Sequence, residues 1–429
     1  MGASSPKCLR DSLRQALHQR ETKLCRRKLT VLPSSSVDFS SNDFLSLSTS
    51  PVLRARFLDH LQQAPPLHPF ASGGSRLLDG NSAYAENLEK YIAEFHNAPS
   101  GLLFNSGFDA NVGVLSTIPQ PGDLIVYDEL IHASAHEGMR LSRAGKRVKF
   151  SHSSPEALEA VLQAEISSDP QLRDGHRNVF IVVESVYSMD GDVAPIGDFL
   201  EVSERLLPCK NGHFIVDEAH ATGVFGPRGA GVVQQLGVED RIFIRMHTFG
   251  KALASHGGMM KLLRLGTGLI GLLAIVLCCS DTRDYLINYA RTLIYTTALG
   301  FPFLASIRSA YEILAEGETV QLQRRLGQLI IYFRSRLESL SAWGPAVLEI
   351  DHFTNSPIFS LRSHVPRELA SVCQQEGYIV RAIMPPTVPA GKERVRVCLH
   401  AGNTMEEIDG LIETIQKWLH QTKKNAARL

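Results

Sequence analysis

Residues 213–220 read HFIVDEAH, and they give the clearest indication of the fold. A short apolar run ends in Asp217, and Glu218 and His220 follow directly. Such a run is typical of a strand that is buried on both faces of a sheet. Similar runs occur at GLLF 101–104, LIVY 124–127, VFIVV 179–183 and RIFI 241–244. We therefore predict a sheet of short buried strands.

Amphipathic helices separate these predicted strands. Residues 82–97 carry apolar side chains on one helical face, and Ser154 followed by Pro155 marks the start of another helix. Strands that alternate with helices form a mostly parallel sheet with helices on both faces, so we predict an α/β fold. In such folds, functional residues collect at the carboxyl ends of the strands.

The chain of 429 residues is long enough for two or three lobes. After about residue 305 the pattern changes to long helices, such as LGQLIIYFRSRLESL at 326–340, and shorter strands. We predict an N-terminal helical segment over 1–50, a large α/β domain over 51–305 and a smaller C-terminal α+β domain over 306–429.

Composition narrows the classes of partner. The chain carries 44 Lys and Arg against 44 Asp and Glu, which argues against general polyanion binding, so we expect no nucleic-acid partner. The seven cysteines show no C-x-x-C pair and no zinc-like spacing, so we predict reduced thiols and no metal site.

The residues at the two ends of the chain bear on the cellular location of the protein. The N-terminal residues lack the apolar segment of a secretory signal. Residues 427–429, Ala-Arg-Leu, are a conservative variant of the Ser-Lys-Leu peroxisomal address. We therefore expect a peroxisomal import receptor as a partner and a peroxisomal location, with the cytoplasm as the alternative.

Polar side chains follow the predicted strands at the point where each strand ends. They are Asn105 and Ser106 after 101–104, His132 after 124–127, Glu184 and Ser188 after 179–183, and Asp217 and His220 after 213–217. Since the carboxyl ends of parallel strands meet at one edge, we expect these side chains to lie together. The Asn-Ser-Gly turn opens an apparent helix, whose free N–H groups suit a phosphate.

Lys251, in HTFGKALASHGG at 247–258, completes a set that fits pyridoxal phosphate. This cofactor needs a lysine for a Schiff base, an acid at its pyridine nitrogen and a phosphate cradle. Lys251 can be the lysine and Asp217 the acid, because a carboxylate beside the ring nitrogen favours its protonated form. His220 can reach the phenolic oxygen, and His132 can stack on the ring. The predicted phosphate contacts are Ser106, Gly107, Phe108 and Thr248.

Longer stretches resemble the α-oxoamine synthases, which are fold-type I pyridoxal-phosphate enzymes that condense an amino acid with an acyl-CoA. These stretches are FNSGFDAN 104–111, DELIHAS 128–134, VVESVYSMDGDVAP 182–195, IVDEAHATGVFG 215–226, DYLINYARTLIYTTAL 284–299 and PPTVPAGKERVRVCLHAG 385–402. DFSSNDFLSLS 38–48 and ASGGSRLLDGN 71–81 are similar to the branch that joins L-alanine to pimeloyl-CoA in biotin synthesis. The resemblance implies the fold-type I architecture and a homodimer with its active site at the subunit interface.

The resemblance also implies roles for single residues. Lys251 is expected to move the α-proton as well as to bind the cofactor. Arg396 is expected to hold the amino acid's carboxylate through its two-pronged guanidinium, while Thr387 and Arg26 meet the acyl substrate. The remaining implied cofactor contacts are Ser106, Gly107, Phe108, Glu184, Ser188 and Thr248, with Thr296 and Thr297 on the partner subunit's phosphate.

Two features depart from the resemblance. Met384 precedes PPTVP where bacterial relatives carry arginine, which leaves the acyl chain open. An apolar insert, MMKLLRLGTGLIGLLA at 259–274, follows the lysine segment. Three interpretations stay open for it: a gene-model or splicing error, a loop or helix packed on the core, and a membrane segment.

The leading prediction is a decarboxylative condensation of L-alanine with pimeloyl-CoA that releases CoA and CO2, with no membrane partner. One alternative is another α-oxoamine synthase that uses glycine or serine with a different acyl-CoA. The other is a non-catalytic family member or an inactive product, because a reacting lysine tolerates little displacement and the insert lies beside Lys251.

Overall fold

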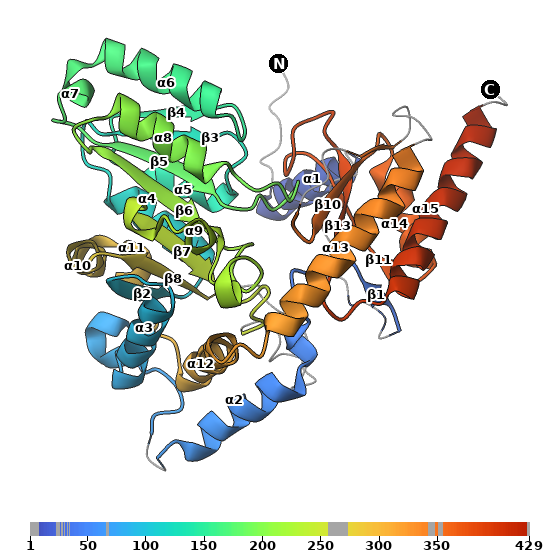
Figure 1. Ribbon diagram of the computed structural model, residues 1–429, viewed down its shortest axis with the longest axis horizontal. Coiled ribbons are helices and arrows are strands. Elements are labelled where there is room, and N and C mark those ends of the chain that lie inside the picture. Colours follow the sequence, from blue (N-terminus) through green and yellow to red (C-terminus); the bar gives the residue numbers. More distant parts are fainter. Residues whose placement is uncertain are drawn as a thin grey trace.

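The computed structural model describes residues 8–22, 26, 29, 31, 33, 35–65, 68–255, 273–341, 348–350 and 355–426. Figure 1 shows a large sheet covered by helices and, beside it, a smaller sheet packed against long helices near the C-terminus. A boundary between them near residue 305, with a separate segment over 1–50, stays a prediction.

The large sheet has seven strands in the order β2-β8-β7-β6-β5-β3-β4. They are β2 (Ser100–Phe104), β3 (Leu124–Asp128), β4 (Lys146–Phe150), β5 (Val179–Glu184), β6 (Gly212–Asp217), β7 (Ile244–Thr248) and β8 (Ala274–Cys278). Strand β8 is antiparallel to both β2 and β7, and the pairs from β7 through β4 are parallel. The predicted α/β fold with a mostly parallel central sheet is confirmed.

Helices cover both faces of this sheet (Figure 1). One face carries α4 (Gly107–Thr117), α5 (Ala133–Leu141), α10 (Ser280–Tyr289) and α11 (Arg291–Ile294), and the other carries α6 (Pro155–Ser168), α7 (Pro170–Arg173), α8 (Ile196–Leu206) and α9 (Val232–Leu236). Successive side chains of β5 alternate between the faces: Ile181 and Val183 pack toward α6 and α8, whereas Phe180 and Val182 pack toward α4 and α5. Burial on both faces explains the unbroken apolar runs.

Capping residues set where the predicted helices begin. Ser154 accepts a hydrogen bond from the N–H of Ala157, and Pro155 occupies the first turn of α6. Ser82 caps α3 (Ala83–Phe95) in the same way through the N–H of Ala85. These serines satisfy N–H groups that a helix start leaves without partners.

The smaller sheet is antiparallel, in the order β12-β13-β10-β9. Its elements are β9 (Glu349–Ile350), β10 (Ile358–Arg362), β12 (Arg381–Ile383) and β13 (Arg394–Cys398), packed with α13 (Val320–Ser341), α14 (Pro366–Gln375) and α15 (Met405–Ala426). The remaining elements are α1 (Leu9–Thr22), β1 (Val37–Asp38), η1 (Leu47–Thr49), α2 (Pro51–Gln63), η2 (Arg76–Gly80), η3 (Pro227–Gly229), η4 (Glu239–Arg241), α12 (Phe301–Ala315) and β11 (Tyr378–Ile379). Strand β1 pairs with β11, so an early segment packs against the C-terminal part of the chain.

The predicted strand at 241–244 is wrong in its position. Residues 239–241 form η4, and β7 runs from Ile244 to Thr248. The sequence RMHT hides this strand because Arg245 and His247 are polar and yet buried. Each finds a partner far along the chain: Arg245 donates to the carbonyl of His96, and His247 hydrogen-bonds to Thr222.

The apolar insert at 259–274 falls mostly outside the described residues, so its three interpretations stay open. Its last residue, Ala274, is described and begins β8 (Ala274–Cys278). Within the described residues, no helix is both long and apolar enough to cross a membrane.

Candidate active site

The carboxyl ends of β5, β6 and β7 bring predicted site residues together. Glu184 and Asp217 are directly paired at the ends of β5 and β6, and Asp217 is paired with Met246 of β7. Thr248 ends β7, and the loop after it carries Lys251. All these polar side chains are buried, so the site is a desolvated group of charges at one edge of the sheet.

Asp217 is held by two hydrogen bonds. Its Oδ2 accepts from Nδ2 of Asn111 at 2.9 Å, and its Oδ1 accepts from the N–H of Ala219 at 3.0 Å. Asn111 lies on α4 and uses its second amide hydrogen on Oγ of Ser134, also at 2.9 Å. The carboxylate is thereby fixed in orientation while it stays buried.

The same network orients His132, the N-cap residue of α5. Its Nδ1 accepts from the N–H of Ser134 at 3.2 Å and lies 2.7 Å from Oγ of Ser134. Because Nδ1 accepts a hydrogen bond from the backbone N–H of Ser134, it carries no proton. We therefore assign the single proton of the neutral ring to Nε2. His132 therefore presents an N–H donor on the side of the ring that faces away from the helix start.

The side chain of Lys251 lies among these buried groups, and its pKa is lowered. Burial lowers the pKa of its ammonium to about 8, although Asp217 and Glu184 favour the charged form. Glu184 responds in the opposite direction, because burial and the neighbouring Asp217 raise its pKa well above the usual range. A lysine that loses its proton this easily is suited to act as a nucleophile or a base.

Two buried polar atoms in the site lack hydrogen-bond partners among the described residues. They are Nδ1 of His220 and Oε1 of Glu184. Burial lowers the pKa of His220 well below its ordinary value, so its ring is neutral. Buried groups without partners are uncommon in proteins, and here they indicate that a ligand completes the site.

The start of α4 lies against Thr248. A Cβ atom added at Gly107 would approach Cγ2 of Thr248 to 2.7 Å, so this close approach requires glycine. Ser106 caps the helix through the N–H of Asp109, which leaves the N–H groups of Gly107 and Phe108 without intrahelical acceptors. This corner has the properties of a phosphate site.

Asn105 connects this corner to the segment after α11. Its Nδ2 donates to Oγ1 of Thr296 at 3.0 Å and to the carbonyl of Thr297 at 2.8 Å. Phe108 is 49% exposed, and the side chain of Thr297 is also exposed. Both threonines therefore lie beside the first turn of α4 in the same chain.

Arg396 reaches the site from β13 of the smaller sheet. Its Nε donates to the carbonyl of Ser188 at 2.7 Å, and its Nη2 donates to Oδ1 of Asn42 at 2.8 Å. The guanidinium is buried, and its Nη1 has no partner within the described part of the chain. A buried arginine with donors to spare is suited to bind a carboxylate.

A cavity of about 630 Å³ opens beside His132. Its lining residues are Glu129, Leu130, Ile131, His132, Ala133, His136, Tyr187, Ser188, Met189, Asp190, Pro385, Pro386, Thr387, Val388, Pro389, Ala390 and Arg394. The predicted residues Thr387 and Ser188 thus lie on it, whereas Arg26 does not. Arg26 is exposed and forms a 3.0 Å ion pair with Glu21. A volume of this size suits a small organic ligand.

Comparisons with known proteins agree with this geometry. The family model described as aminotransferase class I and II matches residues 34–415. The chain belongs to the aminotransferase class I and II family. It is 76% identical over 425 residues to an 8-amino-7-oxononanoate synthase of Emericella nidulans, with 99% of each chain covered. The predicted resemblance to α-oxoamine synthases is thereby confirmed.

One further relative is similar to this chain in sequence, and one solved structure is similar to it in fold. An aminoacyl transferase, sphA, of Aspergillus fumigatus is 40% identical over 422 residues, which cover 94% of this chain and 86% of the relative. The crystal structure of an 8-amino-7-oxononanoate synthase from Francisella tularensis superimposes with a TM-score of 0.70 at 26% identity, over 91% of this chain and 100% of that one.

The donor set in this aminotransferase class I and II chain fits pyridoxal phosphate. Lys251 supplies an amine of lowered pKa, and Asp217 supplies an oriented carboxylate. His220 presents a buried ring whose Nδ1 has no partner among the described residues, and Gly107 opens the phosphate corner. These are the parts that this cofactor requires of a protein.

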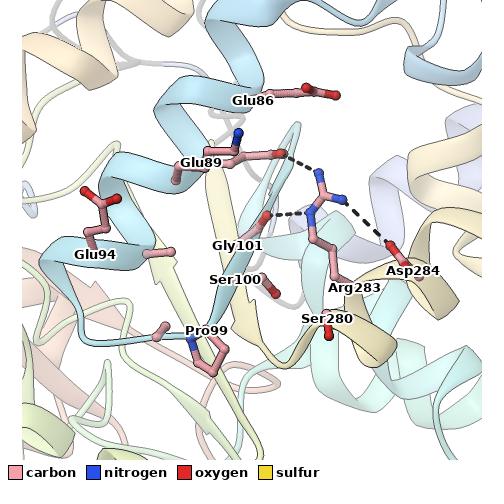
Figure 2. A pocket seen from close by; sticks show the side chains of 12 residues that line it. Glu86, Glu89, Glu94, Pro99, Ser100, Gly101, Ser280, Arg283 and Asp284 are labelled. Carbon is pink, nitrogen blue, oxygen red and sulfur yellow. Dashed lines mark hydrogen bonds and ion pairs between the residues drawn. The ribbon is translucent and has the colours of Figure 1, made fainter.

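A second cavity, of about 370 Å³, is lined in part by the first residues of β2, Ser100 and Gly101. Ion pairs beside this cavity hold β2 in place. Figure 2 shows Arg283 reaching from α10 to Glu89 and to the carbonyl of Gly101. The buried Glu89 also binds Arg76 and accepts from the N–H of Leu103 at 2.8 Å. This ion cluster anchors β2, the strand that leads into Asn105 and the phosphate corner.

Sequence reasoning missed the residues that orient the predicted ones. Asn111 and Ser134 stand in the quoted motifs FNSGFDAN and DELIHAS, and Asn42 stands in DFSSNDFLSLS. Their side chains carry no distinctive chemistry of their own. Only their contacts with Asp217 and Arg396 mark them as part of the site.

Proposed function

We propose that this chain is an 8-amino-7-oxononanoate synthase, which condenses L-alanine with pimeloyl-CoA and releases CoA and CO2. The observation that carries the proposal is the 76% identity to a relative of that name over 99% of both chains. The convergence of Lys251, Asp217 and Arg396 on one site supports it, because the reaction needs an amine, an acid and a carboxylate anchor.

The site residues would hold pyridoxal phosphate in a defined way. Lys251 would bind it covalently, and Asp217 would accept a hydrogen bond from its pyridine nitrogen. His132 would lie on one face of the ring, with His220, Glu184 and Ser188 around it. The phosphate would bind at the first turn of α4, beside Thr248. Thr296 and Thr297 would contact the phosphate of the cofactor in the partner subunit. When bound, this cofactor supplies an electron sink for the pair left at the α-carbon.

The protein's own groups perform the binding and proton transfers. Arg396 binds the carboxylate of L-alanine with the donors that Ser188 and Asn42 leave free. With its pKa lowered to about 8 by burial, the Lys251 amine removes the α-proton and later returns a proton to that carbon. The neutral His132 directs its Nε2–H toward the reacting groups, and Thr387 lines the path of the acyl thioester.

The proposal is tested with purified protein loaded with pyridoxal phosphate. L-Alanine, glycine and L-serine are each supplied with pimeloyl-CoA, and CoA release and product mass are followed. We expect turnover with L-alanine and the mass of 8-amino-7-oxononanoate. Turnover with glycine or serine alone would reject this substrate pair, and the absence of any turnover would favour an inactive product.

A second candidate is favoured by the relative sphA, named an aminoacyl transferase, at 40% identity. Such an enzyme would share Lys251 and Asp217 but use a different amino acid and acyl donor. The same assay separates the two candidates if other amino acids and acyl-CoAs of other chain lengths are included. A preference for another pair over L-alanine with pimeloyl-CoA would select the second.

We further propose a homodimer whose active site is completed at the interface. Large apolar side chains stand exposed at Phe70, Leu77, Leu78, Phe108 and Tyr295, with exposed fractions of 48% to 74%. Phe108 and Tyr295 flank the phosphate corner, so a second subunit covering them would also close the site. Light scattering that gave only a monomer would reject this proposal.

The C-terminal residues 427–429 support import into peroxisomes, where they would bind the import receptor. They lie outside the described residues, so the support is the tripeptide itself. A fluorescent fusion that keeps the C-terminus free should collect in peroxisomes, and deletion of Leu429 should release it to the cytoplasm.

A further inference from the structure

The large cavity beside His132 has an uneven distribution of charge. One wall is the loop 385–390, which is rich in proline, and the other is α5 with the residues before it. Among the lining residues, the side chains that can carry positive charge are His132, His136 and Arg394. These three side chains are the candidates for an ionic contact with an anionic group that enters the cavity.

Two of these three side chains already have partners. Arg394 is buried, and its guanidinium forms an ion pair with Asp190. His132 is held by Ser134 at the start of α5, beside the reacting groups. The acidic lining residue Glu129 pairs with Lys149 at 3.4 Å. Of the three, His136 is the one whose side chain makes no hydrogen bond or ion pair to the described residues.

His136 is exposed to the cavity, and its ring makes no hydrogen bond to the described residues. It lies four positions after His132, the N-cap residue of α5, which corresponds to a rise of about 6 Å along the helix, and both residues line the cavity. The ring of Tyr127 packs edge-on against it, with the centroids 5.4 Å apart. A packed ring with a free N–H is a ready donor.

We propose that His136 binds the far carboxylate of the dicarboxylic acyl group and thereby selects pimeloyl-CoA over monocarboxylic acyl-CoAs. The inference rests on the proposed function, because it takes the acyl substrate from there. The acyl carbonyl must reach the reacting groups beside His132 and Lys251. An acyl chain that extends from there along α5 brings its free carboxylate to the ring one turn further on.

The ligand chemistry that His136 recognises is an anionic oxygen, which an acyl-CoA offers in two places. The free carboxylate is one, and the phosphates of CoA are the other. The proposal commits to the carboxylate. Heptanoyl-CoA separates the two, because it has the same chain length and the same CoA but no carboxylate.

The test measures binding by calorimetry with the cofactor-loaded protein in the absence of an amino acid. Pimeloyl-CoA and heptanoyl-CoA are titrated into the wild type, His136→Leu and His136→Gln. We expect the wild type to prefer pimeloyl-CoA, and His136→Leu to bind it about tenfold more weakly while heptanoyl-CoA affinity changes less than about twofold. His136→Gln keeps a donor and should retain part of the preference.

Glu137→Gln is the matched control, because Glu137 follows on the same helix, pairs with Arg140 and does not line the cavity. It should change neither affinity. Equal losses for both acyl-CoAs in His136→Leu would overturn the proposal in favour of a CoA phosphate contact, and so would a wild type without preference. Failure of the proposed function shows differently: the preference would persist while L-alanine gives no product.

Discussion

Asn111 donates a hydrogen bond to Asp217 across 2.9 Å although the two residues are 106 positions apart in the chain. The same amide holds Ser134, and through Ser134 it orients His132. One neutral side chain therefore sets the direction of both the acid expected at the ring nitrogen and the ring expected to cover the cofactor. Asn111 acts as a positioning residue for both.

We predict that Asn111→Leu, which keeps the volume and removes both donors, lowers kcat by about tenfold or more. The buried carboxylate of Asp217 would lose a donor, at a cost of about 1–3 kcal/mol. Steady-state kinetics measure kcat, and the visible spectrum of the bound cofactor reports whether its electronic environment has changed. Asn288→Leu, on the exposed surface of α10, is the control and should leave both unchanged.

The lowered pKa of Lys251 predicts how cofactor capture depends on pH. Only the neutral amine attacks an aldehyde, and burial brings the pKa of this amine to about 8, from the value of about 10.4 that lysine has in water. The neutral fraction therefore rises as pH rises through about 8. Stopped-flow absorbance after addition of pyridoxal phosphate to cofactor-free protein should give a rate with its midpoint there. A midpoint near 10 would mean that the site does not lower the lysine pKa.

Arg396→Lys should weaken L-alanine binding while the protein stays folded. Lysine keeps the charge but cannot contact Ser188, Asn42 and a carboxylate at once in the fixed geometry of a guanidinium. We expect KM for L-alanine to rise about tenfold or more, with a smaller effect on KM for the acyl-CoA. Arg381→Lys is the control: Arg381 is paired with Arg396 across the sheet, but its side chain hydrogen-bonds only to Ser40 among the described residues.

Glu89→Gln should lower the free energy of unfolding by about 3 kcal/mol. The carboxylate is 2% exposed and is shared by Arg76 and Arg283, so the neutral amide leaves two cations without their common partner. Urea denaturation followed by circular dichroism measures the loss. Glu94→Gln lies on the same cavity, is exposed and should shift the midpoint little. Equal effects of the two variants would contradict a role for burial.

The strands that end at the site could be predicted because burial on both faces leaves unbroken apolar runs, as in residues 179–183 and 213–217. The position of strand β7 was predicted wrongly because its side chains Arg245 and His247 are polar, and the hydrogen bonds that accompany their burial go to His96 and Thr222, which are distant in sequence. Residue type and position after a strand indicated Asp217 and Lys251. No such signal marks Asn42, whose contact with Arg396 spans 354 positions.

The effect of the insert near Lys251 on cofactor binding is tested by comparing two versions of the protein. The insert, residues 259–274, should be kept in one version of the protein and removed in another, because it directly follows the segment that carries Lys251. If the insert belongs to the active chain, the longer version binds the cofactor. If only the shorter version does so, a splicing or gene-model error explains the segment.

Locating the cofactor on the chain tests the proposed role of Lys251 directly. The protein is loaded with pyridoxal phosphate, reduced with borohydride to make the bond permanent, digested, and analysed by mass spectrometry. We expect a single pyridoxyl-phosphate adduct on Lys251 and its loss in Lys251→Ala. An adduct on another lysine, or none in a folded protein, would contradict that role.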